Sequence, residues 1–155
     1  MISEDSLQLE TMLNHILNAN RGILHVALID RTGFLIRSVS RKNKENPAFI
    51  DKLGIIGNAM FQTAEEQELC HDFGEISIQV TEYQHAFIFS SNIAASAILI
   101  IAAEKHLVTN IGMLYHLTKK YQHQIDKVLK DFVQVDPRSI PEDVRAMFAD
   151  FNNLN

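Results

Sequence analysis

Apolar residues along the first third of the chain follow first a helical and then a strand pattern. Over residues 5–20 they recur at steps of three and four, which places them on one face of a helix. Two short apolar runs follow at 23–29 and 34–39, and the intervening Asp30, Arg31, Thr32 and Gly33 suit a tight turn. The pattern predicts a helix and then a β-hairpin whose first strand is buried on both faces.

A second helix is expected from Pro47 to about Leu69, because proline suits the first turn of a helix. One of its two apolar stripes contains Gly54 and Gly57, and glycine inside a helix costs about 1 kcal/mol relative to alanine. The small size of glycine allows another backbone to approach closely. This flank is therefore expected to pack either on the protein's own sheet or on a second copy of the same helix.

The second half of the chain carries three further strands and a long helix. Residues 73–82 alternate between apolar and polar, with Ile76, Ile78 and Val80 on one face, which predicts a strand whose other face is exposed. Adjacent antiparallel strands are expected at 86–89 and 94–103, with a turn at residues 90–92. A helix over about 108–132 starts at a cap formed by Thr109 or Asn110. Residues 141–151 then show the spacing of a short amphipathic helix.

Together these elements predict an α/β (α+β) fold with a five-stranded antiparallel sheet and helices on both faces. The expected order is α-β-β-α-β-β-β-α, followed by the short C-terminal helix. A chain of 155 residues is long enough for one hydrophobic core. We expect a main domain over residues 1–132 and a C-terminal extension over residues 133–155.

Composition and charge exclude several classes of protein. A formal net charge of -5 argues against a nucleic-acid partner, since binding phosphates requires clustered lysine and arginine. The single cysteine, Cys70, cannot form an internal disulfide, which favours a cytoplasmic location. The most apolar stretch, residues 86–103, is interrupted by serine and asparagine, so no membrane span is expected.

Catalytic and cofactor motifs are missing from the sequence. None of the seven histidines is spaced with a cysteine or carboxylate as a zinc site requires, and neither glycine-rich phosphate-binding motif occurs. Cys70 and His71 are adjacent, but neighbours at a helix end do not point together, and no third group orients them. We therefore expect no enzyme activity, no metal and no cofactor.

Two local motifs resemble the roadblock, or dynein light-chain, family. The hydrophobic strand that runs into Asp30-Arg31-Thr32-Gly33 resembles the family's D-x-x-G hairpin, and Thr109-Asn110-Ile111-Gly112 resembles the start of its last helix. The order of the predicted elements is also similar over about residues 7–130. The extension after Phe132 looks similar to the tail of prokaryotic GTPase-regulator members.

The resemblance implies a two-fold homodimer in which the second helices pair and the third strands join edge to edge. The expected dimer contacts are Ile50, Gly54, Gly57, Asn58 and Phe61 on the helix and Ile76, Ile78 and Val80 on the strand. The expected partner-binding residues are Asp51, Gln62 and Glu65, with Val144, Met147, Phe148 and Phe151 in the extension.

Three functions are consistent with this sequence. The first is a dimeric, non-catalytic scaffold that binds and regulates a small Ras-like GTPase, as the resemblance implies. The second is an adaptor or light-chain-like subunit that holds an extended peptide, for example by strand addition. The third is a small-molecule sensor, for which His25 and His85 would mark an internal polar pocket.

Overall fold

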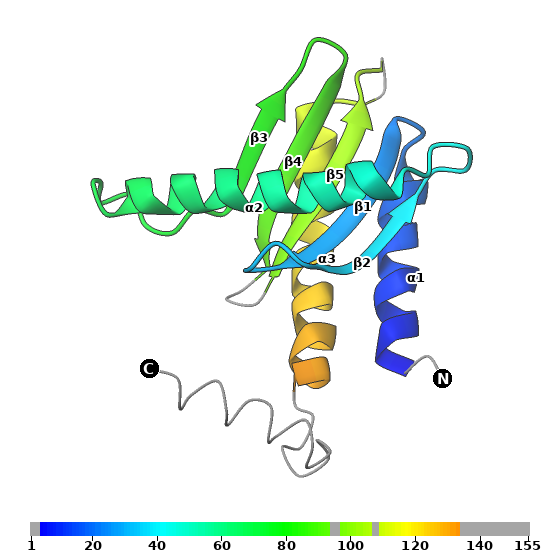
Figure 1. The fold of residues 1–155 in the computed structure, drawn as a ribbon, viewed down its shortest axis with the longest axis horizontal. Helices are drawn as coiled ribbons and strands as arrows, with labels where there is room; N and C mark the ends of the chain where they lie inside the picture. The colour runs from blue at the N-terminus through cyan, green and yellow to red at the C-terminus, as the bar shows by residue number, and fades with distance from the viewer. Residues whose placement is uncertain (1–3, 94–96, 107–108, 134–155) are drawn as a thin grey trace.

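The computed structural model of the protein describes residues 4–93, 97–106 and 109–133 (Figure 1). The elements are α1 (Glu4–Ala19), β1 (Ile23–Asp30), β2 (Leu35–Ser40), α2 (Pro47–Glu68), β3 (Ile78–Glu82), β4 (Ala86–Ile93), β5 (Ala97–Glu104) and α3 (Ile111–Val133). They occur in the predicted order. The expected C-terminal helix lies outside the described residues.

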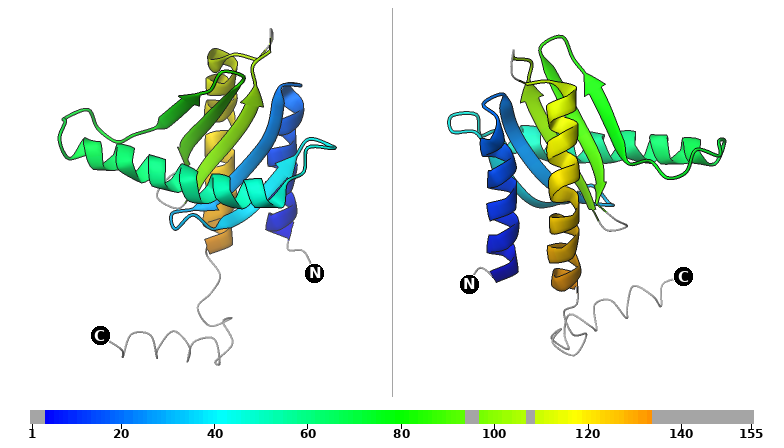
Figure 2. Two further views of the ribbon diagram at one scale, coloured as in Figure 1. Left: turned by 45° about the horizontal axis from the view of Figure 1, so that its top comes forward. Right: turned by 180° about the vertical axis from the view of Figure 1, so that it is seen from behind.

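The five strands form one antiparallel sheet in the order β2-β1-β5-β4-β3. Helices α1 and α3 lie side by side on one face of the sheet, and α2 crosses the other face (Figures 1 and 2). The predicted α+β fold with helices on both faces is therefore confirmed. The two edge strands, β2 and β3, belong to different hairpins and lie at opposite ends of the sheet.

The sheet separates two hydrophobic clusters. The larger one joins α1 and α3 to one face of the sheet, and the smaller one joins α2 to the other face. Strands β1 and β5 contribute side chains to both clusters, because successive residues of a strand point to opposite faces. This explains why both strands read as almost continuous apolar runs, and it confirms the prediction that β1 is covered on both sides.

The strand predicted over residues 73–82 is shorter than expected. Regular pairing starts only at Ile78, and Ile76 packs with the α2-side cluster while Ile78 packs on the opposite face. The expected placement of Ile76, Ile78 and Val80 on one face is therefore wrong for Ile76. Its backbone N–H donates to the Glu68 carboxylate at the end of α2, which holds the connecting segment away from the ladder.

The turn predicted at residues 90–92 is also wrong. Strand β4 runs through this segment to Ile93, and Ser90 and Ser91 pair with β3 on one side and β5 on the other. Both serines are buried. Their small side chains fit inside a central strand, whereas their polar character alone suggested a loop.

The hairpin between β1 and β2 is held by Asp30. Its carboxylate accepts hydrogen bonds from the backbone N–H groups of Thr32 and Phe34, at 2.8 and 3.0 Å, and from the Thr32 hydroxyl. Desolvation, the largest single influence, favours a higher pKa, but these hydrogen bonds and one from Gly33 together lower the pKa of Asp30. Gly33 has a φ of 90°, which explains why glycine ends this turn.

Asparagine side chains cap the N-termini of α2 and α3. The Asn46 side chain accepts from Phe49 N–H at 3.1 Å at the start of α2, and Asn110 accepts from Met113 N–H at 2.9 Å at the start of α3. Of the two caps considered for α3, the structure thus selects Asn110. No helix within the described ranges has the length and apolar character needed to cross a membrane.

Candidate functional site

The glycine flank of α2 faces the protein's own sheet. A Cβ atom added to Gly54 would lie 3.0 Å from the Gly33 carbonyl oxygen and 3.3 Å from Ile29 Cγ2. A Cβ atom added to Gly57 would lie 2.7 Å from Ile100 Cδ1. The two glycines therefore allow α2 to approach the β1–β2 turn and β5 closely, which is the first of the two alternatives that the sequence left open.

The helix residues expected in a dimer contact lie on this inner flank. Phe61 is fully buried, and Ile50, Gly54, Gly57 and Asn58 are buried as well. A second copy could reach them only if α2 left its sheet. Their placement corrects the expected contact, because these five residues already serve the packing of a single chain. Dimer formation itself stays a prediction and requires other surfaces.

Arg31 links the C-terminal half of α2 to the sheet. Its guanidinium donates to Glu65 on α2 and to Asn92 on β4, and it lies 5.6 Å from the centre of the Phe61 ring. The Gln62 side chain donates to the Arg31 carbonyl oxygen at 3.4 Å. Gln62 and Glu65 were expected to bind a partner, but the structure places both against Arg31. Sequence periodicity could not reveal this bridge, which joins three separate elements.

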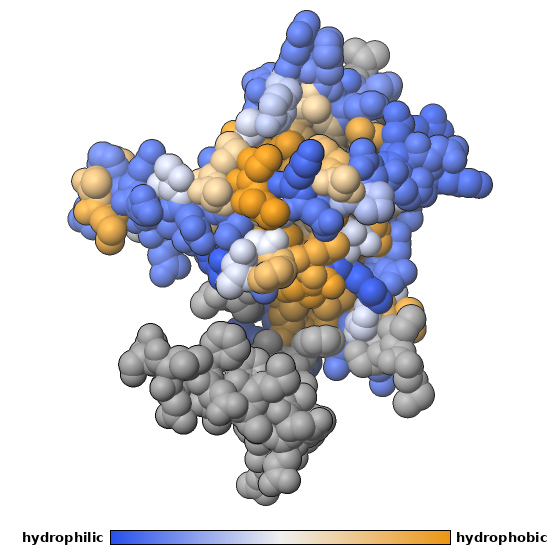
Figure 3. Space-filling view, in the orientation of Figure 1, coloured by the Kyte–Doolittle hydropathy of each residue, from blue (hydrophilic) through white to orange (hydrophobic). Residues whose placement is uncertain are grey.

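Apolar side chains gather on the outer side of α2 and at its free end. Ile55 and Ile56 are 65% and 55% exposed, and Leu69 and Phe73 just beyond the helix are 89% and 85% exposed. Figure 3 shows hydrophobic side chains over and beside α2 on this face of the molecule. Figure 1 shows that the C-terminal part of α2 extends past β3, beyond the edge of the sheet. Within one chain, none of the residues that the structure describes covers this surface.

Strand β3 ends the sheet and presents unpaired backbone groups. Tyr83 N–H donates to the Ala86 carbonyl at 2.8 Å, and Asn92 N–H donates to the Ser77 carbonyl at 2.9 Å, which fixes the alternation of the β3–β4 ladder. By that alternation the backbone groups of Ile78, Val80 and Glu82 point away from β4. Since β3 is an edge strand of the described sheet, they form an open edge.

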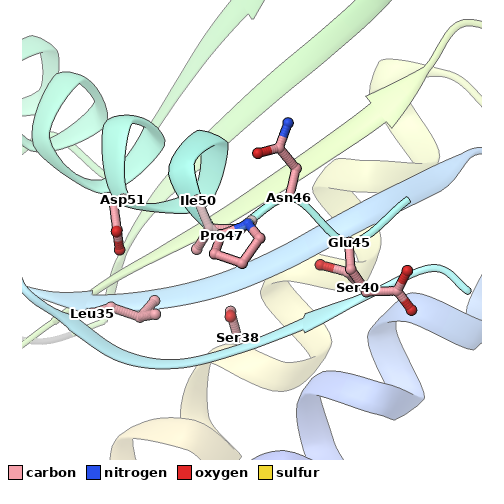
Figure 4. Close-up of a pocket in the computed structure, with 8 residues that line it drawn as sticks. All are labelled: Leu35, Ser38, Ser40, Glu45, Asn46, Pro47, Ile50 and Asp51. Atoms are coloured by element: carbon pink, nitrogen blue, oxygen red, sulfur yellow. The ribbon is translucent and has the colours of Figure 1, made fainter. Parts of the chain in front are cut away.

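A groove runs between β2 and the first half of α2. One part, of about 270 Å³, is lined by Leu35, Ser38, Ser40, Glu45, Asn46, Pro47, Ile50 and Asp51 (Figure 4). The second part, of about 450 Å³, shares Leu35, Ile50 and Asp51 and continues along Thr32, Gly33, Phe34, Gly54 and Ile55. Asp51 was expected to bind a partner, and the structure places it on the wall of this groove, exposed.

The two histidines considered for a sensor pocket do not share a site. His25 is buried on β1, with Nδ1 2.9 Å from the Ser40 hydroxyl oxygen and its ring 5.2 Å from the Phe49 ring. His85 lies exposed in the turn between β3 and β4. Within the part of the chain that the structure describes, no group of three or more His, Cys, Asp or Glu residues could hold a metal ion.

Burial of His25 predicts a loss of stability in acid. Desolvation lowers the pKa of His25, with a further lowering by Lys44 that the carboxylate of Glu45 opposes. A lowered pKa in the folded state means that the unfolded chain binds the proton more readily. The free energy of unfolding should therefore fall as pH drops through about 6.5, the ordinary histidine value.

Urea unfolding at several pH values measures this effect. His25→Gln should flatten the acid limb of the stability profile, whereas the exposed control His85→Gln should leave it unchanged. An acid limb with the same slope in His25→Gln as in the wild type would assign the effect to other groups.

The sequence also matches a family model over most of its length. The model is described as "Mitogen-activated protein kinase kinase 1 interacting", and the match covers residues 7–133. The chain belongs to this family. No curated protein sequence matches it significantly.

Solved structures with the same fold include bacterial roadblock proteins. "MglB with tetrameric arrangement" superposes with a TM-score of 0.75 at 13% identity, covering 84% of this chain and 94% of that one. Myxococcus xanthus MglB gives a TM-score of 0.72 at 15% identity, covering 88% and 98%. A Roadblock/LC7 domain from Streptomyces avermitilis gives 0.66 at 11%, covering 81% and 97%. The resemblance to the roadblock fold noted from the sequence is thus confirmed.

Proposed function

We infer that this family member is a non-catalytic, cytoplasmic scaffold that forms a two-fold homodimer and binds a small Ras-like GTPase. The observation that carries the proposal is the open edge of β3 next to the overhanging end of α2. An open edge with exposed apolar neighbours is a ready template for a second strand.

The proposed dimer pairs β3 with β3 of the second copy. Ile78, Val80 and Glu82 supply the outward backbone groups, so the contact joins two five-stranded sheets into one. A two-fold axis at this edge would carry the overhang of α2 onto the partner's sheet. Leu69 and Phe73, which are exposed among the residues that the structure describes, would then be covered together with part of the outer side of α2.

This contact replaces the one expected from the sequence. The strand residues Ile78 and Val80 stay in the proposed interface, whereas the inner flank of α2 leaves it. MglB, whose fold this chain shares, is described in a tetrameric arrangement, which supports self-association of this fold. The family resemblance implies that such a dimer presents the α2 helices on one side and the joined sheet on the other, and that one of these surfaces binds the GTPase.

Retention of a GTPase by the immobilised full chain tests the proposal that the partner is a small Ras-like GTPase. A small Ras-like GTPase loaded with a non-hydrolysable GTP analogue should be retained, and the same GTPase loaded with GDP should be retained several-fold less. Equal retention of both forms, or retention of neither, would contradict the proposed GTPase binding. Neither result bears on the proposed dimer, which is tested separately.

An adaptor without GTPase contact is the second candidate. The family description favours it, because that description names interaction with a protein kinase kinase. An adaptor of this kind would retain its partner regardless of the nucleotide in the assay. The same experiment with a kinase kinase in place of the GTPase therefore separates the two candidates.

A further inference from the structure

The edge of the sheet opposite β3 is also open. Arg41 N–H donates to the Leu24 carbonyl at 2.7 Å, which fixes the alternation of the β1–β2 ladder. By that alternation the backbone groups of Ser38 and Ser40 point away from β1. Strand β2 is the other edge of the described sheet, so these groups are available to an additional strand.

The groove beside β2 adds side-chain contacts to this edge. Ser38 and Ser40 line it, and Leu35 at the start of the strand is 41% exposed beside Phe34, which is 74% exposed. In Figure 4, Leu35, Ser38 and Ser40 lie along β2 below the start of α2. A segment paired with β2 would place every second side chain on this face of the sheet.

The charges along the groove are of one sign. Glu45 lies near one end, and Asp51 projects from α2 toward Leu35 in Figure 4. Both carboxylates are exposed, and no residue that lines either part of the groove is basic. The groove therefore has an apolar part that lies between two carboxylates. This arrangement complements a segment in which one apolar residue lies between two basic residues.

We propose that β2 and this groove bind an extended segment of a partner protein by strand addition. The segment presents Lys or Arg, an apolar residue and Lys or Arg at alternate positions. Its backbone pairs with Ser38 and Ser40, its apolar side chain enters the groove at Leu35 and Ile50, and its basic side chains meet Glu45 and Asp51. The site does not depend on the dimer, since β2 and β3 lie at opposite edges.

A fluorescent nonapeptide, Thr-Val-Lys-Val-Leu-Val-Lys-Val-Thr, is a suitable probe, with binding followed by anisotropy and by NMR shifts of the full chain. The expected result is saturable binding that shifts resonances of residues 35–40 and 45–55. N-methylation of the backbone amides of the two lysines and the leucine should weaken binding at least about tenfold, because the side chains remain while the strand hydrogen bonds are lost.

Protein variants locate the site. Ser38→Pro removes an outward N–H and should weaken binding about tenfold, and Asp51→Lys should do the same through charge repulsion. Glu66→Lys makes the same charge change on an exposed part of α2 away from the groove, so it should change binding less than about twofold.

Three results would overturn the proposal. They are the absence of saturable binding, equal affinity for the N-methylated and unmodified peptides, and resonance shifts confined to other surfaces. The N-methylated peptide tests the wild-type chain, so the experiment stays decisive if Ser38→Pro fails to fold. Binding that persists in Val80→Pro would show that the β2 site works without β3 pairing.

Discussion

Val80→Pro is expected to turn the dimer into a folded monomer. Val80 lies in the middle of β3, and its N–H points away from β4, so proline removes no hydrogen bond of the chain's own ladder. In the dimer it removes that donor twice, once in each copy, and places a ring in the strand contact. At about 1 to 1.5 kcal/mol for each of the two lost hydrogen bonds, the dimer Kd should rise about thirty- to one-hundred-and-fiftyfold.

Sedimentation velocity over a range of concentrations measures this change. Ser38→Pro is the matched control, since it makes the same substitution at the same kind of position on the opposite edge strand. The control should remain dimeric, and both variants should keep the helix and strand content of the wild type. A Val80→Pro protein that sediments as the wild-type dimer would remove β3 from the interface.

The second large effect is expected at Gly54. Alanine normally stabilises a helix by about 1 kcal/mol relative to glycine. Here Gly54→Ala should instead lower the free energy of unfolding by about 1 to 3 kcal/mol, because its Cβ would meet the Gly33 carbonyl oxygen at 3.0 Å. A backbone atom in a hydrogen-bonded turn cannot move aside without cost.

Gly57→Ala is the internal comparison for this prediction. Its Cβ would meet only the Ile100 side chain, whose flexible end, Cδ1, is the atom at 2.7 Å, so the variant should lie within about 1 kcal/mol of the wild type. Denaturant unfolding measures both. A Gly54→Ala protein that is more stable than the wild type would mean that this flank faces outward, toward solvent or a second copy.

Local patterns in the sequence predicted most of the fold. The helical spacing of α1 and α3, the Asp30–Gly33 turn and the proline at the start of α2 each depend on residues close together in the chain. Such local patterns predict the structure correctly because the geometry of neighbouring residues, and not distant contacts, determines these turns and helices. The wrong predictions concern segments in which tertiary packing outweighs the polarity of the residues. Ser90 and Ser91 are buried in β4, and the segment before Ile78 is held by Glu68.

The candidate surfaces were harder to predict than the fold. Glycines at helical spacing indicate a close approach, but the spacing does not say whether the approaching backbone is the chain's own turn or another copy. Arg31 joins the hairpin, α2 and β4, and its partners Glu65 and Asn92 are far away in sequence. Edge strands likewise follow only from the strand order, which places β2 and β3 at opposite ends.

Amide hydrogen exchange of the wild-type chain at two concentrations tests whether β3 pairs with β3 of a second copy. In a single chain the N–H groups of Ile78, Val80 and Glu82 point toward solvent, so pairing of two β3 strands must slow their exchange. Pairing of two β3 strands should give strong protection of these three amides at high concentration and loss of that protection on dilution, with Ser38 and Ser40 exchanging fast at both concentrations. Fast exchange of the three β3 amides at every concentration would contradict it.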